Sequence, residues 1–270
     1  MLAPANIATA WDRVRRNEGA PGVDGITVRD LESTFAQEWR RNANALQAGT
    51  WKPHPVRRVT IPKPTGGWRV LGIPTVLDRV VHQALAQILT PRWEARFSAR
   101  SFGFRKGRST LDALNRLAKD ASAVSNPLAW HLDIREFFDR VPRAMALRAV
   151  ARVTTDQRLQ QLVATILSAG VLNGVNWEAT PLGLPQGSPL SPLLANAVLH
   201  PLDLWMTEQA LPFIRYADDI VILLPRRGPM QTLSNPWPSA CPKALLGEHR
   251  FFDCRAFIQE KLTRLGLELN

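Results

Sequence analysis

The sequence contains little cysteine. Only Cys241 and Cys254 occur in 270 residues, too few for the disulfide framework that holds many small secreted proteins together. His249 lies between them, but two cysteines and one histidine fall short of the four ligands of a structural zinc site. We therefore expect neither a disulfide scaffold nor a zinc centre.

Long apolar runs are also missing. No stretch approaches the roughly 18–20 consecutive apolar residues of a membrane-spanning helix. The N-terminus lacks the short apolar segment of a signal peptide. These two observations predict a cytoplasmic protein without a membrane partner.

Acidic residues are the third deficit. The chain has 23 Asp and Glu against 34 Lys and Arg, a net charge of +11 at pH 7. This excess favours a polyanionic partner such as nucleic acid. Acidic membranes are the alternative, which the missing apolar runs disfavour. Hydrophobic residues make up 45% of the chain, enough for a folded core of one or two subdomains.

The most informative stretch is Tyr216-Ala217-Asp218-Asp219, which contains the only tyrosine. It lies between two short apolar runs, residues 211–214 and 220–224, a pattern typical of a β-hairpin. Adjacent carboxylates repel each other, so a hairpin tip that carries two of them favours a compensating cation. An ordinary Asp-rich turn is the alternative interpretation.

A second acidic position lies upstream. An apolar run leads into Asp133, and a carboxylate at the end of a buried strand is costly unless a cation compensates it. Asp133, Asp218 and Asp219 together would provide three carboxylates able to hold two Mg²⁺ or Mn²⁺ ions, the metals that oxygen ligands favour. We interpret Asp139 as a helix N-cap or a surface partner rather than a ligand.

Six motifs, in order along the chain, resemble those of prokaryotic reverse transcriptases of the group II intron-encoded (maturase) type. They are residues 20–25 (APGVDG), 61–74 (IPKPTGGWRVLGIP), 101–109 (SFGFRKGRS), 132–139 (LDIREFFD), 183–192 (GLPQGSPLSP) and 216–219 (YADD). Each motif alone is weak, but six in the expected order are specific. The resemblance implies an RNA-directed DNA polymerase.

The implied fold is α+β, the fingers and palm of a right-hand polymerase, with a small antiparallel sheet packed by helices and the thumb absent. The implied division is an N-terminal helical region at 1–50, fingers at 51–128, palm at 129–224 and an atypical loop with the start of the palm C-terminus at 225–270. In relatives, a lysine-containing motif and a helical thumb follow the last of these segments.

The resemblance also implies roles for individual residues. Asp133, Asp218 and Asp219 would be the catalytic metal ligands. Phe138 would lie under the sugar of the incoming nucleotide and exclude a 2′-hydroxyl, while Phe137 fills the core. Nucleotide contacts are implied for Lys63, Arg69, Ile134, Phe138 and Gln186, and template phosphate contacts for Arg105, Lys106 and Arg108.

The implied partners are an RNA template, a DNA primer and deoxynucleoside triphosphates, with an intron RNA or a CRISPR or defence protein as a further partner. Two alternatives stay open. One is an RNA-binding splicing or defence component with an idle polymerase centre. The other is an RNA-dependent RNA polymerase, which Phe138 and the Pro-Gln-Gly motif disfavour.

The hydrophobic pattern predicts further elements. Residues 1–50 are expected to be helical, with an amphipathic segment around Leu31, Phe35 and Trp39. A helix with apolar positions from Leu77 to Ile88 is expected to be interrupted at Pro91. Residues 144–167 are expected to be helical, as is the segment from about 190 to 208. Residues 225–254 are rich in proline and glycine, which opposes regular structure.

Overall fold

The computed structural model describes residues 1–62, 66–124, 127–174, 176–180, 182–225 and 250–270. The proline-rich stretch after Pro225, including Cys241, lies outside the described residues. The chain divides into two compact units. Unit 1 comprises Met1–Ala95 and Val141–Ala195, and unit 2 comprises Arg96–Arg140 and Asn196–Asn270.

Unit 1 combines helices with a four-stranded sheet in the order β2-β1-β4-β5. Strands β1 and β2 form an antiparallel hairpin, and β4 pairs with β1 in parallel. Its elements are α1 (Pro4–Arg16), α2 (Val28–Glu32), α3 (Phe35–Ala48), β1 (Val56–Pro62), β2 (Trp68–Ile73), α4 (Val76–Glu94), α7 (Arg143–Ala151), α8 (Gln157–Leu167), β4 (Val171–Asn173) and β5 (Asn176–Glu178).

The expected helical start of the chain is confirmed, as three helices. Helix α2 begins with a capping box between Thr27 and Asp30. One apolar cluster joins α1, α2 and α4, and Phe35 and Trp39 pack against it. The rings of Trp11 and Phe35 stack with centroids 4.2 Å apart, so aromatic packing anchors α3 to the cluster.

Helix α4 does not end where the sequence predicts. It continues through Pro91 to Glu94, although proline removes one helical hydrogen bond at a cost of about 3 kcal/mol. Leu89 and Trp93, on either side of Pro91, are each 1% exposed. Their burial stabilises the last turn of the helix more than the missing bond destabilises it, so the expected interruption at Pro91 is wrong.

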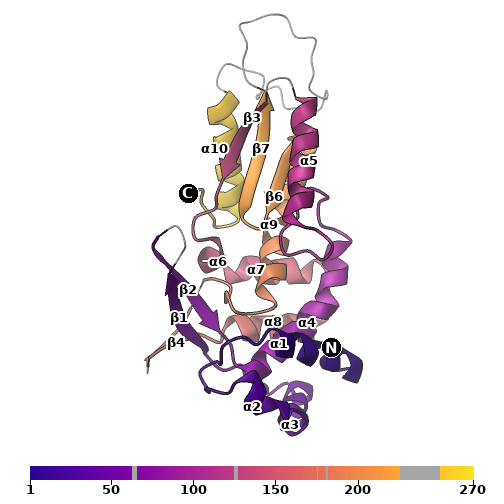
Figure 1. Ribbon diagram of the computed structural model, residues 1–270, viewed down its shortest axis with the longest axis vertical. Helices are drawn as coiled ribbons and strands as arrows, with labels where there is room; N and C mark the ends of the chain where they lie inside the picture. Colours follow the sequence, from indigo (N-terminus) through magenta and orange to yellow (C-terminus); the bar gives the residue numbers. More distant parts are fainter. Residues whose placement is uncertain (63–65, 125–126, 175, 181, 226–249) are drawn as a thin grey trace, which may run out of the picture. The chain divides into compact units, whose positions relative to one another are not determined.

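Unit 2 is built on a three-stranded antiparallel sheet with β7 in the centre, in the order β3-β7-β6 (Figure 1). Helix α5 lies beside β6, where Ala113 of the helix packs with Phe102 and Ile214. The elements are α5 (Thr110–Ala123), β3 (Pro127–Leu132), α6 (Phe137–Arg140), β6 (Phe213–Tyr216), β7 (Asp219–Pro225) and α10 (Arg250–Arg264), with α9 (Ser191–Glu208) beginning in unit 1 and continuing into unit 2.

The expected hairpin and the helix from about 190 to 208 are therefore confirmed, and residues 144–167 form two helices rather than one. None of the helices in the described ranges is both long and apolar enough to cross a membrane.

Candidate active site

The turn between β6 and β7 presents the paired aspartates. Tyr216 pairs with Asp219, which leaves Ala217 and Asp218 as the two central residues of a tight turn. Ala217 has a φ of +57°, as the first central residue of a type II′ hairpin requires. A side chain in this left-handed region costs about 1–2 kcal/mol, so contacts around Ala217 must hold the turn in place. Asp218 is half-buried and Asp219 is exposed.

Asp133 lies at the same end of the sheet. Strand β3 pairs antiparallel with β7, and Leu132 opposite Ile220 is the last pair of the ladder. Asp133 follows directly, and on β7 Asp219 precedes Ile220. The structure therefore brings the end of β3 and the start of β7 together, as the three-carboxylate hypothesis requires. Asp133 also accepts a hydrogen bond on Oδ2 from Asn270 Nδ2 at 3.0 Å.

His131 joins this group, a residue that the sequence analysis did not identify. Its Nε2 lies 3.0 Å from Oδ1 of Asp219, with side-chain exposures of 62% and 59%. An exposed pair of this kind contributes little to stability, but it orients one carboxylate oxygen. The available sequence signal is spacing, because residues two apart on a strand share a face and His131 is two residues before Asp133.

These carboxylates suit a hard divalent cation, which prefers oxygen ligands. Among the residues that the structure describes, no three His, Cys, Asp or Glu side chains converge as a ready-made metal site. Mg²⁺ is usually held by one or two carboxylates together with waters and substrate phosphates. Asp133, Asp218 and Asp219 fit a site of that kind, in which the nucleotide supplies the remaining ligands.

Helix α6 follows Asp133 and carries two phenylalanines that differ in burial. Phe137 is 2% exposed, which confirms its predicted place in the core. Phe138 is half-buried, and its ring meets that of Phe104 edge to face, with centroids 6.0 Å apart. Asp139 lies inside α6 rather than at its N-cap, so that part of the interpretation is wrong.

The burial of Ile134 limits how this residue could contact a nucleotide. Its side chain is 1% exposed, and its backbone forms a bridge with Leu269. A buried aliphatic side chain belongs to the core, so any nucleotide contact at this position has to come from the main chain.

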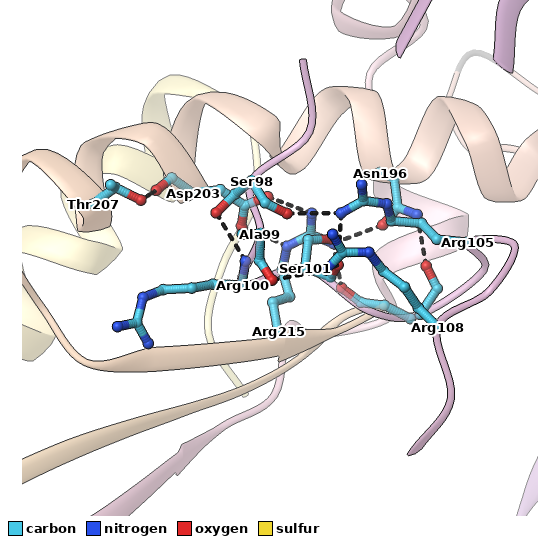
Figure 2. A network of polar contacts seen from close by, with 12 residues as sticks. Ser98, Ala99, Arg100, Ser101, Arg105, Arg108, Asn196, Asp203, Thr207 and Arg215 are labelled. Carbon is cyan, nitrogen blue, oxygen red and sulfur yellow. Dashed lines mark hydrogen bonds and ion pairs between the residues drawn. The ribbon is translucent and has the colours of Figure 1, made fainter. Parts of the chain in front are cut away.

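Arg105 also differs from the expected phosphate ligand. Its side chain is 7% exposed, and its Nη1 donates hydrogen bonds of 2.7 Å to the carbonyls of Ser98 and Ser101 (Figure 2). The guanidinium also lies over the ring of Phe97, 5.2 Å from its centroid. This group braces the loop from inside, so its prediction as a template contact is wrong.

The other two basic residues of this loop differ from each other. Arg108 is half-buried, and its Nη1 donates to the Ala99 carbonyl at 2.7 Å (Figure 2). Lys106 is exposed. Lys106 is therefore the residue of this loop that is best placed to meet a phosphate.

The remaining nucleotide-binding candidates belong to unit 1. Arg69 is exposed on β2 opposite Ile61, and Lys63 lies outside the described residues.

Gln186 is half-buried in the loop before α9. The next residue, Gly187, donates its N–H to the Gly72 carbonyl at 3.1 Å, and a β-carbon there would be 2.7 Å from that oxygen. Glycine therefore lets the Gln186 loop dock on the strand that carries Arg69.

A buried histidine supports the same loop. His82 of α4 has its Nδ1 3.0 Å from Ser188 Oγ, and this oxygen also accepts from the Leu190 N–H at 3.2 Å. Burial lowers the pKa of His82 to about 4, so the ring is neutral at pH 7. The sequence analysis did not identify His82, and the available signal is its place between the apolar helix positions Val81 and Leu85.

Comparisons with known proteins identify the family and the fold of the chain. The family described as "Reverse transcriptase (RNA-dependent DNA polymerase)" matches residues 61–237. Protein YkfC of Escherichia coli K12 is 34% identical over 194 residues, which cover 71% of this chain and 51% of YkfC. The group II intron-encoded protein LtrA of Lactococcus lactis subsp. cremoris is 31% identical over 218 residues, 80% of this chain and 36% of LtrA. The chain thus spans about half or less of these relatives.

Solved structures support the fold. A chain of a partial Cas6-RT-Cas1–Cas2 complex matches with a TM-score of 0.51 and 24% identity, over 84% of this chain and 38% of that chain. An apo telomerase from Candida tropicalis, truncated from its C-terminal domain, matches with a TM-score of 0.51 and 13% identity, over 71% of this chain and 49% of that one. With mixed helices and small sheets, the fingers-and-palm fold class is confirmed. The chain belongs to the reverse transcriptase (RNA-dependent DNA polymerase) family, and its homologues include group II intron-encoded proteins.

Proposed function

We propose that this chain is the catalytic part of an RNA-directed DNA polymerase of the group II intron type. It would add deoxynucleotides to the 3′-hydroxyl of a primer paired with an RNA template. The observation that carries the proposal is the position of Asp133 beside the turn with Asp218 and Asp219, at one end of the β3-β7-β6 sheet, in a chain of the reverse transcriptase family.

The carboxylates have assigned roles in this proposal. Asp133 and Asp218 would hold two Mg²⁺ ions, or Mn²⁺ in their place, and Asp219 would support them. Two such ions, when bound, stabilise the attacking and leaving oxygens of an in-line displacement. His131 keeps an oxygen of Asp219 oriented through its 3.0 Å contact. The 3′-oxygen attacks the α-phosphorus, and pyrophosphate leaves.

Several residues are proposed to contact the nucleotide. Arg69 and Lys63 would bind the triphosphate, for which a guanidinium fork has suitable geometry. Gln186 and its loop would line the nucleotide pocket. The half-buried ring of Phe138 would lie under the sugar, supported from its edge by Phe104. In functional terms residues 51–128 would act as fingers and residues 129–224 as palm, between the helical region at 1–50 and the segment at 225–270.

Template binding would rest on exposed basic residues. Lys106 is the candidate in the loop before α5, whereas Arg105 and Arg108 hold the shape of that loop. An intron-type RNA is the proposed partner, because the similarity to the intron-encoded LtrA covers 80% of this chain at 31% identity. The likeness to the Cas1-containing complex, at 24% identity, supports the fold.

The experiment is primer extension on an RNA template with deoxynucleotides and Mg²⁺. Asp218→Asn keeps the size of the side chain and removes its charge, so we expect extension to fall by several orders of magnitude. Asp12→Asn, at a surface ion pair of α1, is the matched control and should extend like the wild type.

Extension by Asp218→Asn at the wild-type rate would contradict the metal assignment. A wild type that binds RNA and does not extend a primer would favour an RNA-binding splicing or defence component. A wild type that prefers ribonucleotides would favour an RNA-dependent RNA polymerase.

A further inference from the structure

Arg215 is a buried arginine directly before the catalytic turn. Its side chain is fully buried, as is that of Asp203. Nε and Nη2 of Arg215 donate to the two carboxylate oxygens of Asp203 at 2.7 and 2.6 Å. This is a bidentate pair between β6 and α9 (Figure 2), with the geometry in which a guanidinium binds a carboxylate best.

The third nitrogen of the Arg215 guanidinium, Nη1, faces the turn itself. Nη1 of Arg215 donates to the Ala217 carbonyl at 2.8 Å and to Oδ1 of Asn196 at 2.8 Å. The side chain therefore folds back over its own hairpin and holds the carbonyl of the residue with the strained φ of +57°. Asp218, the proposed metal ligand, is the next residue.

A second set of contacts connects the turn with α9 and with the segment from Arg100 to Gly103. Nδ2 of Asn196 donates to the Gly103 carbonyl at 2.8 Å, and Gly103 packs against the backbone of Ala217. The main chain of Arg215 also donates to the Arg100 carbonyl and accepts from the Phe102 N–H, both at 2.9 Å. The turn is thus held by its own arginine, by α9 and by the segment from Arg100 to Gly103.

A buried ion pair is a poor way to gain stability alone. Removing two charges from water costs about as much as their attraction returns, and apolar replacements are often equally stable. The directional contacts of this pair, by contrast, converge on one carbonyl in the turn. The contribution of the Arg215–Asp203 pair is therefore to hold the geometry of the turn.

We propose that Arg215, held by Asp203 and Asn196, is a positioning residue that fixes the turn carrying Asp218 and Asp219. The proposal rests on the proposed function for its catalytic consequence. Without the fork, the turn would relax away from the left-handed conformation of Ala217, and the two carboxylates would move relative to Asp133.

The test separates an effect on the position of the catalytic turn from an effect on the stability of the protein. Arg215→Met alone leaves the Asp203 carboxylate buried without its partner and should lower the melting temperature. The double variant Arg215→Met/Asp203→Leu replaces the pair by apolar side chains and should melt near the wild type. We expect its kcat for primer extension to stay on the order of a hundred-fold low, with unchanged affinity for primer–template.

Hydrogen exchange gives a readout that does not need activity. Amides of residues 213–224 should exchange faster in the double variant than in the wild type, even at equal melting temperature. Arg116→Met is the control, because Arg116 pairs with Asp120 on α5 in the same unit and does not touch the turn. It should change neither exchange in this segment nor kcat.

A second variant keeps the proposal testable if the double variant does not fold. Asn196→Ala retains the ion pair and removes the contacts to Arg215 and Gly103, so it should speed exchange of the same segment and lower kcat. Wild-type exchange and kcat in a folded variant would overturn the proposal. A wild type without polymerase activity would refute the proposed function, while exchange would still report on the turn.

Discussion

Gly103 lies against Ala217 so closely that a β-carbon added to Gly103 would be 2.4 Å from the Ala217 nitrogen and 3.0 Å from the Tyr216 carbonyl carbon. Both are backbone atoms, which cannot rotate away as a side chain can. The loop from Ser101 to Ser109 and the catalytic hairpin therefore share one tightly packed contact.

Gly103→Ala should displace the catalytic turn. The added methyl group requires either the loop or the hairpin to move, and overpacking of this kind typically costs about 1–3 kcal/mol. We expect a lower melting temperature together with a fall in kcat for primer extension on the order of a hundred-fold, since small misplacements at an active site have effects of that size.

The matched control is Gly107→Ala in the same loop. Gly107 has a φ of +73° and nothing within 4 Å of an added β-carbon, so the substitution costs about 1–2 kcal/mol in backbone conformation without a clash. Its kcat should stay near that of the wild type. Equal loss of kcat in both variants would show that loop stability, rather than the contact with Ala217, determines activity.

Phe138→Ala should weaken discrimination against ribonucleotides. Removing the ring opens space for a 2′-hydroxyl, and a difference of roughly 1–3 kcal/mol in the ratio of kcat/KM is expected. The measurement compares kcat/KM for a deoxynucleotide and for its ribonucleotide in wild type and variant.

Phe137→Leu is the control for Phe138, because Phe137 is a core neighbour at 2% exposure. It should lower stability and leave the sugar ratio unchanged. Unchanged discrimination in Phe138→Ala would place Phe138 among the core residues and remove it from the nucleotide site.

Lys106→Ala should weaken primer–template binding and flatten its salt dependence. Each phosphate contact releases counterions, so losing one contact should reduce the log–log slope by roughly 0.7–0.9. Lys119→Ala, at an exposed lysine of α5, is the control and should leave the slope unchanged. A salt slope that does not change in Lys106→Ala would remove Lys106 from the interface.

Arg105→Ala should instead lower the melting temperature, because the carbonyls of Ser98 and Ser101 lose their hydrogen-bond donor.

The sequence predicts those features of this protein that depend on neighbouring residues. The β6–β7 hairpin is an example, since two short apolar runs on either side of a tight polar segment are local signals. The position of Asp133 beside that hairpin is a long-range pairing. The apolar run that leads into Asp133 and the family resemblance both indicate a shared site of three aspartates, but the residues between the two strands do not encode the pairing.

The failures have a common physical cause, which is that burial and distant partners are invisible in the sequence. The sequence predicts that the helix ends at Pro91, but the packing of Leu89 and Trp93 extends it to Glu94. The resemblance implies a phosphate contact for Arg105, whereas in the structure its guanidinium donates to backbone carbonyls. Arg215 was overlooked because its partner Asp203 lies on a helix that gives no sign of facing it.

Acid should destabilise the protein through His82. Burial lowers the pKa of His82 to about 4 in the folded protein, whereas an unfolded histidine titrates near 6.5. The folded state therefore disfavours the protonated ring. This contribution to stability is fully present above pH ~6.5 and is lost as the pH falls toward 4. By pH 5 the loss should be on the order of 2 kcal/mol.

The measurement is the free energy of unfolding in urea between pH 7.5 and 4.5 for the wild type and His82→Gln. Glutamine stays neutral throughout and can still reach Ser188 Oγ. All other ionisable groups are the same in both proteins, so the difference between the two curves isolates His82. The wild type should lose more stability than the variant below pH 6.5. Parallel curves would mean that the ring takes up its proton while folded, in conflict with its full burial against α4 and the Ser188 loop.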